Sequence, residues 1–199
     1  MRRWVPAFAG TTKFREPASR NYVKLNTMRA MRRFLIVFVV LLVVSFAIEL
    51  TPPAQAWLVT PWTDAVASAS AALMRVFDAT IATSGNVISS SATPFAVSIE
   101  AGCNGVEATL VLVAAMLAFA APWPHRLRGI VVGIVAVQAL NVLRVISLFY
   151  LGRWNRDVFE WAHLYVWQAL IMLDVLIVWV IWVRLVPASP PAASPAGAA

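Results

Sequence analysis

One thiol, one imidazole and one guanidinium in this 199-residue chain could together carry out acyl transfer. Cys103 is the only cysteine, and His163 is one of only two histidines. A thiolate is a strong nucleophile, a neutral imidazole can take a proton and return it to a leaving amine, and a fixed cation can stabilise an oxyanion. We therefore predict that Cys103 is the nucleophile, that His163 is the general acid and base, and that Arg144 stabilises the oxyanion or orients the bond to be broken.

The position of Cys103 suggests how its thiol could become reactive. We expect it to begin the second membrane helix from the outer side, where unpaired amides and the positive end of the helix dipole would lower the pKa of the thiol. Taken alone, a single cysteine in a membrane protein is more often a small buried apolar residue. One cysteine excludes an internal disulfide and CxxC redox chemistry, and with two histidines we expect no metal site and no cofactor.

Arg144 belongs to a polar stripe on an otherwise apolar helix. Gln138, Asn141 and Arg144 stand at positions i, i+3 and i+6, so they share one face that should point into a helix bundle. We predict Asn141, Glu107 and Asp174 as supporting residues, because either acid could neutralise the arginine. Two non-enzymatic interpretations compete. The chain could be an assembly subunit whose arginine pairs with Glu107 or Asp174 to hold helices together, or a small transporter with Arg144 and Asp174 along a polar path.

The elements that must position these groups are membrane helices. The chain is 61% hydrophobic and 13% charged, with a mean hydropathy of +0.77, whereas soluble domains have about 45–50% apolar and about 25% charged residues. A helix needs about 20 apolar residues to cross a bilayer. We therefore predict an all-α integral membrane protein with four transmembrane helices, over residues 34–50, 105–121, 129–151 and 164–183.

A long segment joins the first two predicted membrane helices. Within it, residues 62–81 have apolar side chains at helical spacing, including Val66, Leu73 and Phe77, which predicts an amphipathic helix on the outer membrane surface. Residues 86–100 then alternate between apolar and polar side chains, which predicts a short β-hairpin. This hairpin would lead the chain directly to Cys103.

The two ends of the chain have compositions that do not favour packing. We predict a disordered basic tail over residues 1–30, with Met28 or Met31 as alternative starts, and a disordered proline- and alanine-rich tail over residues 186–199. The four-helix membrane domain would then cover residues 31–185.

A cleavable signal peptide is a competing interpretation of residues 31–56, because Ala54-Gln55-Ala56 resembles a cleavage site. The intervening Glu49, Pro52 and Pro53 argue against it.

The basic residues indicate orientation rather than nucleic-acid binding. The net charge is +7, but residues 1–28 carry six of the sixteen Lys and Arg residues, and the remainder forms no dense basic face. Cytoplasmic loops of membrane proteins are enriched in Lys and Arg. Six arginines outside the predicted spans would share one side: Arg29, Arg32, Arg33, Arg126, Arg128 and Arg184. Only Arg75, Arg153 and Arg156 would lie on the other. We therefore expect a multi-pass protein of a bacterial inner membrane with both termini in the cytoplasm, the site at the periplasmic side, and the lipid bilayer as its surroundings.

Three motifs resemble those of the exosortase/archaeosortase family of membrane-embedded cysteine proteases or transpeptidases. They are Glu-Ala-Gly-Cys-Asn-Gly-Val-Glu over residues 100–107, Asn-Val-Leu-Arg-Val over residues 141–145, and His163 at the start of the last span. Each motif is weak alone, but their order and spacing across successive spans are fairly specific. The likeness covers residues 34–185 and is greatest to the compact exosortase H type, although many members of the family have more spans than the four predicted here.

The resemblance implies both a substrate and a reaction. The substrates would be exported proteins with a C-terminal sorting signal, which consists of a short motif, a transmembrane helix and a basic cluster. The exosortase H type is associated with signals of the Ile-Pro-Thr-Leu kind. The enzyme would cleave near the motif at the periplasmic face, by thiolate attack and through a thioester acyl-enzyme, and water or an acceptor would complete the reaction.

Overall fold

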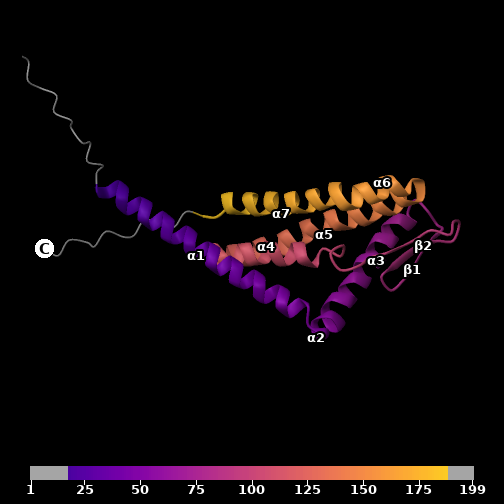
Figure 1. Cartoon of the computed structure of the whole chain (residues 1–199), viewed down its shortest axis with the longest axis horizontal. Coiled ribbons are helices and arrows are strands. Elements are labelled where there is room, and N and C mark those ends of the chain that lie inside the picture. The colour runs from indigo at the N-terminus through magenta and orange to yellow at the C-terminus, as the bar shows by residue number, and fades with distance from the viewer. Residues whose placement is uncertain (1–17, 188–199) are drawn as a thin grey trace, which may run out of the picture.

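The computed structural model describes residues 18–187, with side chains from residue 26 onward, and shows a helical molecule with a small sheet at one end (Figure 1). Its helices are α1 (Ala18–Glu49), α2 (Pro52–Ala54), η1 (Gln55–Val59), α3 (Thr60–Arg75), α4 (Val106–Ala118), α5 (Trp123–Trp154), α6 (Arg156–Trp161), η2 (Ala162–Val166) and α7 (Trp167–Arg184), where η marks a π-helical turn. The strands are β1 (Ile81–Ser84), β2 (Val87–Ser90) and β3 (Ala96–Ser98).

Three helices in the described part of the chain are long and apolar enough to cross a membrane, rather than the four predicted. They cover Asn26–Glu49, Trp123–Trp154 and Arg156–Arg184. The predicted span over residues 105–121 is not confirmed, because α4 has 13 residues and at about 1.5 Å per residue is much shorter than the hydrocarbon layer. Phe119 is already extended, and Pro122 follows closely and cannot continue a helix.

The first helix begins before residue 34, where the first membrane helix was predicted to start. α1 starts at Ala18, so residues 18–30 form its first turns instead of belonging to a disordered tail. No glycine or proline occurs between Pro17 and Pro52, so nothing in the sequence interrupts the helix before that point. Residues 1–17, which contain the rest of the predicted basic tail, lie outside the described residues, as do residues 188–199 of the predicted C-terminal tail.

The amphipathic helix predicted over residues 62–81 is present as α3, but it is shorter and its buried face is a different one. Val66, Ala67, Ala71 and Met74 are buried, whereas the predicted apolar residues further along remain exposed, with Phe77 at 89%. α3 ends at Arg75, and the chain turns into β1 at Ile81. α3 therefore packs against protein on one side and offers an exposed apolar side as well.

The hairpin predicted over residues 86–100 is present as β2 and β3, and β1 adds a third strand. The strands are antiparallel in the order β1-β2-β3, with Ile81 opposite Ser90 and Val87 opposite Ser98. Gly85 has a φ of +57° at the tight turn between β1 and β2, a conformation that favours glycine.

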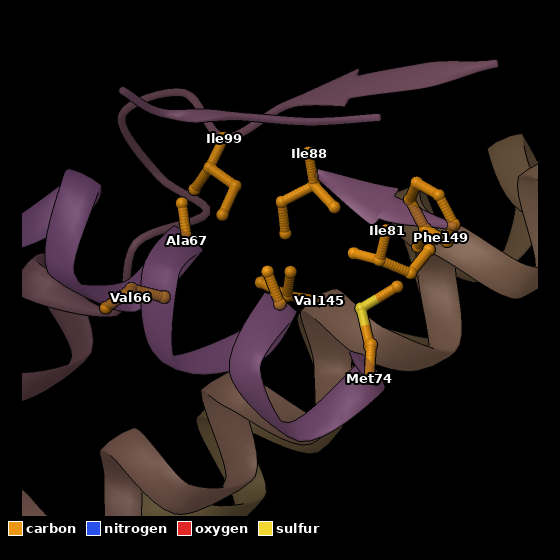
Figure 2. Packing of buried hydrophobic residues seen from close by; sticks show 9 residues of the cluster. Val66, Ala67, Met74, Ile81, Ile88, Ile99, Val145 and Phe149 are labelled. Atoms are coloured by element: carbon orange, nitrogen blue, oxygen red, sulfur yellow. The ribbon is translucent and has the colours of Figure 1, made fainter. Parts of the chain in front are cut away.

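The sheet, α3 and α5 enclose a compact apolar core (Figure 2). Met74 from α3, Ile88 from β2 and Phe149 from α5 are at most 1% exposed. Burying a side chain of this size contributes about 1.5–3 kcal/mol. This core fixes the sheet to the end of α5, and so fixes the loop that follows β3.

A second apolar cluster joins α4, α5 and α7 through residues that include Leu112, Val137 and Ile171. The bundle of these three helices has two ends in Figure 1. The end that adjoins the sheet holds Cys103, Arg144 and His163, and we call it the cysteine end. The end that holds His125, Arg126 and Trp182 is called the tryptophan end.

Candidate active site

Cys103 lies in a tight loop before α4 rather than at the first residue of a helix. α4 begins at Val106, three positions later, so the expectation that Cys103 starts the helix is wrong. Gly102 and Gly105 flank the cysteine with φ values of +83° and +76°. L-residues with a side chain rarely adopt this conformation, so the two glycines allow the chain to turn sharply on each side of the thiol.

Buried hydrogen bonds hold this loop in place. The Asn104 side chain is fully buried, donates to the Thr63 hydroxyl on α3 at 3.0 Å, and accepts from the Val106 amide at 3.0 Å. The Gly102 amide donates to the Glu107 carboxylate at 2.6 Å. Glu107 therefore supports the backbone beside Cys103 instead of pairing with Arg144. Nothing in the sequence pattern distinguished Thr63 as a partner of this loop.

Arg144 reaches the thiol from α5. Its side chain is buried at 3% exposure, and its two terminal nitrogens lie 3.4 Å from the Gly102 carbonyl oxygen and 3.5 Å from the Cys103 Sγ. Within residues 26–187, Arg144 has no carboxylate at ion-pair distance, and its Nε has no hydrogen-bond partner. A buried arginine without a carboxylate is expensive, which argues against a purely structural role for it.

His163 approaches the same thiol from a different part of the chain. Its Nε2 is 3.8 Å from the Cys103 Sγ, and its ring stacks on Phe159 with a centroid distance of 5.7 Å and an interplanar angle of 6°. The residue sits in the π-helical turn η2, between α6 and α7. π-Helical turns are rare in proteins, and those that occur are often found at functional sites. The apolar pattern of this stretch fits an ordinary helix equally well, so the sequence did not predict the turn.

The environment of Cys103 raises the pKa of its thiol, which corrects the expectation of a lowered value. Burial is the largest cause, because it disfavours the charged thiolate, and the nearby Glu107 and Glu100 carboxylates act in the same direction. The Arg144 guanidinium opposes them and lowers the pKa in part. The resting cysteine is therefore a neutral thiol at neutral pH, and it needs a base to become a nucleophile.

The three groups open onto one pocket of about 160 Å³. Its walls come from the end of β3, the Cys103 loop, α5 and the α6–η2 turn, and include Ser98, Leu148 and Phe159 beside the three reactive side chains. The structure thus brings together all three residues for which the sequence predicts a catalytic role.

The other two predicted supporting residues lie in different places: Asn141 packs against the Cys103 loop, and Asp174 does not line the pocket. Asn141 is fully buried, and its side chain packs so close to Gly105 that a Cβ at that glycine would lie 3.1 Å from it. Gln138 fixes the same stretch by donating to the Gly105 carbonyl at 3.1 Å. Asp174 lies on α7 away from the pocket, with one carboxylate oxygen buried and without a partner in the described part of the chain. Asp174 is therefore not part of this site.

The residues that the structure describes contain no group of three or more His, Cys, Asp or Glu side chains that could hold a metal ion. The chemistry that this arrangement can support is that of a thiol in contact with a base and a cation.

Comparison with known proteins identifies the family. The family model described as transmembrane exosortase matches residues 24–180. No curated protein and no solved structure matches the chain. The match covers most of the sequence, including the Cys103 loop, Arg144 and His163. The chain therefore belongs to the transmembrane exosortase family, whose members are cysteine-type transpeptidases of the membrane.

Proposed function

We propose that this exosortase cleaves the C-terminal sorting signal of exported proteins through a thioester on Cys103. The observation that carries the proposal is the placement of the Cys103 Sγ 3.8 Å from the His163 Nε2 and 3.5 Å from an Arg144 nitrogen, at one pocket. The three groups come from distant parts of the sequence. If Arg144 only held helices together, a carboxylate would stabilise its buried charge better than a thiol does.

The reaction has two stages, acylation of Cys103 and release of the acyl group from it. His163 Nε2 takes the proton from the thiol, and the sulfur forms a bond to the carbonyl carbon of the substrate. Arg144 stabilises the oxyanion, the C–N bond breaks, and the leaving amine takes the proton from His163. Water or an acceptor amine then attacks the thioester, breaks the C–S bond and returns a proton to the sulfur. The raised pKa of the Cys103 thiol makes the base necessary for the first step.

The arginine distribution supports an orientation for this site. The first residues of α5 include Arg126 and Arg128, and α7 ends at Arg184, so both lie at the tryptophan end of the bundle. In Figure 1 the first half of α1 extends beyond the same end. By the positive-inside rule we place this end in the cytoplasm, with both termini, and the cysteine end at the periplasmic side of a bacterial inner membrane. This orientation requires the short helix α4, which leads from the Cys103 loop to Phe119 beside Arg126, to return the chain to the cytoplasmic end.

The position of the thiol is compatible with the substrate that the family resemblance implies. Cys103 precedes the apolar helix α4 and adjoins the ends of α5 and η2, at a border between apolar helices and the folded sheet. A bond cleaved there would lie next to a membrane helix of the substrate, and a basic cluster after that helix would remain on the cytoplasmic side. This arrangement is that of a motif, a transmembrane helix and a basic cluster, with Ile-Pro-Thr-Leu as the proposed motif.

Coexpression tests this function. The wild-type chain or its Cys103→Ala variant is produced in bacteria with an exported reporter that ends in the proposed signal, and the mass of the reporter is measured. We expect the wild type to shorten the reporter near the motif and the variant to leave it intact, with equal amounts of both proteins in the membrane. Equal shortening by the two would refute the proposal.

A further inference from the structure

β3 is an edge strand whose hydrogen-bonding pattern is fixed by its neighbours. The Ser90 amide donates to the Phe95 carbonyl at 3.2 Å, and the Ile99 amide donates to the Asn86 carbonyl at 3.0 Å. In an antiparallel pair, the residues that bond to the neighbouring strand alternate with residues that do not. Phe95, Val97 and Ile99 therefore direct their backbone groups toward β2, and the residues between them direct theirs away.

The outward backbone groups of β3 are unused. Ala96 and Ser98 are both exposed, and within the described residues their amides and carbonyls have no hydrogen-bond partner. The opposite edge of the sheet is treated differently, because Arg75 donates to the outward carbonyl of Ile81 on β1 at 2.9 Å. Proteins normally protect an exposed edge, since it can pair with another chain. The edge left open is the one beside the thiol.

The open edge and the reactive groups share a pocket. Ser98 lines the same cavity as Cys103, Arg144 and His163, and only a short loop separates it from the thiol. Leu148 and Phe159 supply apolar surface to the same pocket. An extended peptide along β3 would therefore have backbone partners in the strand, apolar contacts in the pocket, and its next residues at the sulfur.

We propose that β3 binds the substrate residues just before the cleaved bond as a fourth strand, through the outward amides and carbonyls of Ala96 and Ser98. This inference rests on the proposed function. The substrate strand runs parallel to β3, because β3 leads toward Cys103, and the substrate must lead from its exported domain outside to its membrane helix. Main-chain pairing gives affinity with little dependence on sequence.

Pairing of this kind has a period of two. Only every second substrate amide donates to β3, and the amides between them point away. Proline has no N–H, so the proline of an Ile-Pro-Thr-Leu motif has to occupy a position that points away. The amides of the motif's isoleucine and threonine then donate to β3, and that of its leucine does not.

An amide-to-ester scan of a synthetic peptide tests the pairing without changing the enzyme. The peptide carries an outer segment, the Ile-Pro-Thr-Leu motif, an apolar helix and an arginine cluster, and the full-length protein is assayed in detergent. Esters that remove the isoleucine or threonine N–H should each lower kcat/KM by roughly threefold to tenfold, as for one lost hydrogen bond, whereas the leucine ester should not. Equal effects at all three positions, or no effect, would overturn the inference. If the unsubstituted peptide is not cleaved at all, the proposed function fails instead.

A matched pair of proline variants probes the same contact from the enzyme. Ser98→Pro removes an outward N–H from β3, and Thr83→Pro removes an outward N–H from β1, on the edge away from the pocket. We expect Ser98→Pro to lower kcat/KM for the peptide by roughly threefold to tenfold and Thr83→Pro to leave it unchanged. Alkylation of Cys103 by iodoacetamide should proceed at the wild-type rate in both, which shows that each variant is folded. Unchanged kcat/KM in a normally alkylated Ser98→Pro protein would overturn the inference, and loss of a dimer in that variant would assign the edge to a second copy of the chain.

Discussion

At the tryptophan end of the bundle, His125 stacks on Trp182 at 5.3 Å, and the Trp182 indole donates back to the His125 carbonyl at 3.3 Å. Arg126 beside it donates at 2.9 Å to the carbonyl of Phe119, the residue that follows α4. At the cysteine end, His163 and Arg144 instead both approach one sulfur atom, at 3.8 and 3.5 Å. The two ends hold the same residue types in different roles.

The difference shows how to separate structure from chemistry in this chain. At the tryptophan end, histidine and arginine tie helices together through backbone carbonyls and an indole ring. At the cysteine end, His163 and Arg144 instead face a reactive thiol, and the Nδ1 of His163 has no partner in the described residues. An unpaired arginine Nε does not distinguish the two ends, because Arg126 has one as well as Arg144. The tryptophan end therefore supplies natural controls for variants of the cysteine end.

Replacing each of the two histidines should give the largest difference in cleavage rate between the two ends. We expect His163→Gln to lower the rate of signal cleavage by about 10²–10⁴, the usual contribution of a general base. His125→Gln should keep the rate within a few-fold, since it loses only contacts with Trp182, namely ring stacking and a hydrogen bond to the Trp182 carbonyl. Cleavage rates of the purified proteins on the synthetic peptide measure both. Similar losses in the two variants would mean that His163 is only structural.

The two arginines give the next largest contrast. Removing the cation in Arg144→Ala should lower the cleavage rate by about 10²–10³, the range measured for loss of one oxyanion donor. The protein should still accumulate in the membrane, whereas a structural arginine predicts loss of folded protein. Arg126→Ala, which removes a bond to the Phe119 carbonyl, should retain cleavage. Immunoblots of membrane fractions and peptide assays give the two readouts.

Charge at the cysteine end should also tune the thiol itself. Because the Cys103 pKa is raised, alkylation by iodoacetamide should increase with pH up to values above those of an ordinary thiol. Glu107→Gln removes a negative charge that raises this pKa, so it should speed alkylation at neutral pH. Arg144→Ala removes the charge that lowers the pKa, so it should slow alkylation. Rates measured from pH 6 to about 10 check the order, and a Glu107→Gln protein slower than wild type would contradict it.

Stability changes at the two loop glycines should be the smallest. Gly102→Ala places a Cβ in open space, so only its φ of +83° opposes the change, and about 1–2 kcal/mol of stability should be lost. Gly105→Ala adds to a similar φ a contact of 2.8 Å with Gln138, so it should lose more. Thermal unfolding of the two proteins in detergent compares them. Equal melting temperatures would show that the polar stripe of α5 does not hold the loop.

Hydrophobic patterns predicted much of the fold, and the errors of that prediction have local causes. Long apolar runs predict α1, α5 and the last helix because the bilayer requires such lengths. α4 was overestimated, since Gly105 and Ala121 have apolar neighbours that do not reveal where a helix stops, although Pro122 marks the limit. β1 was not predicted: its first residue, Ile81, falls at the end of the predicted preceding helix and no element was predicted for the rest, because four residues are too few to show alternation.

The sequence predicted which three residues the candidate site brings together, but not the pKa of the thiol or the contacts that support the loop. Cys103, Arg144 and His163 were expected from residue type and order, and the structure brings them together. The direction of the thiol's pKa shift was wrong, because burial depends on tertiary packing that a local motif does not show. Asp174 lies elsewhere, and Thr63 was missed, for the same reason: contacts between distant helices are not visible in spacing along one helix.

Capture of the covalent intermediate tests the central claim most directly. The purified protein is mixed with the synthetic signal peptide, quenched in acid and digested, and the fragment that contains Cys103 is weighed by mass spectrometry. We predict a mass increase equal to the acyl part of the peptide, reversed by hydroxylamine and absent in Cys103→Ala. Cleavage of the peptide with no adduct on Cys103, together with full activity of Cys103→Ala, would contradict the account.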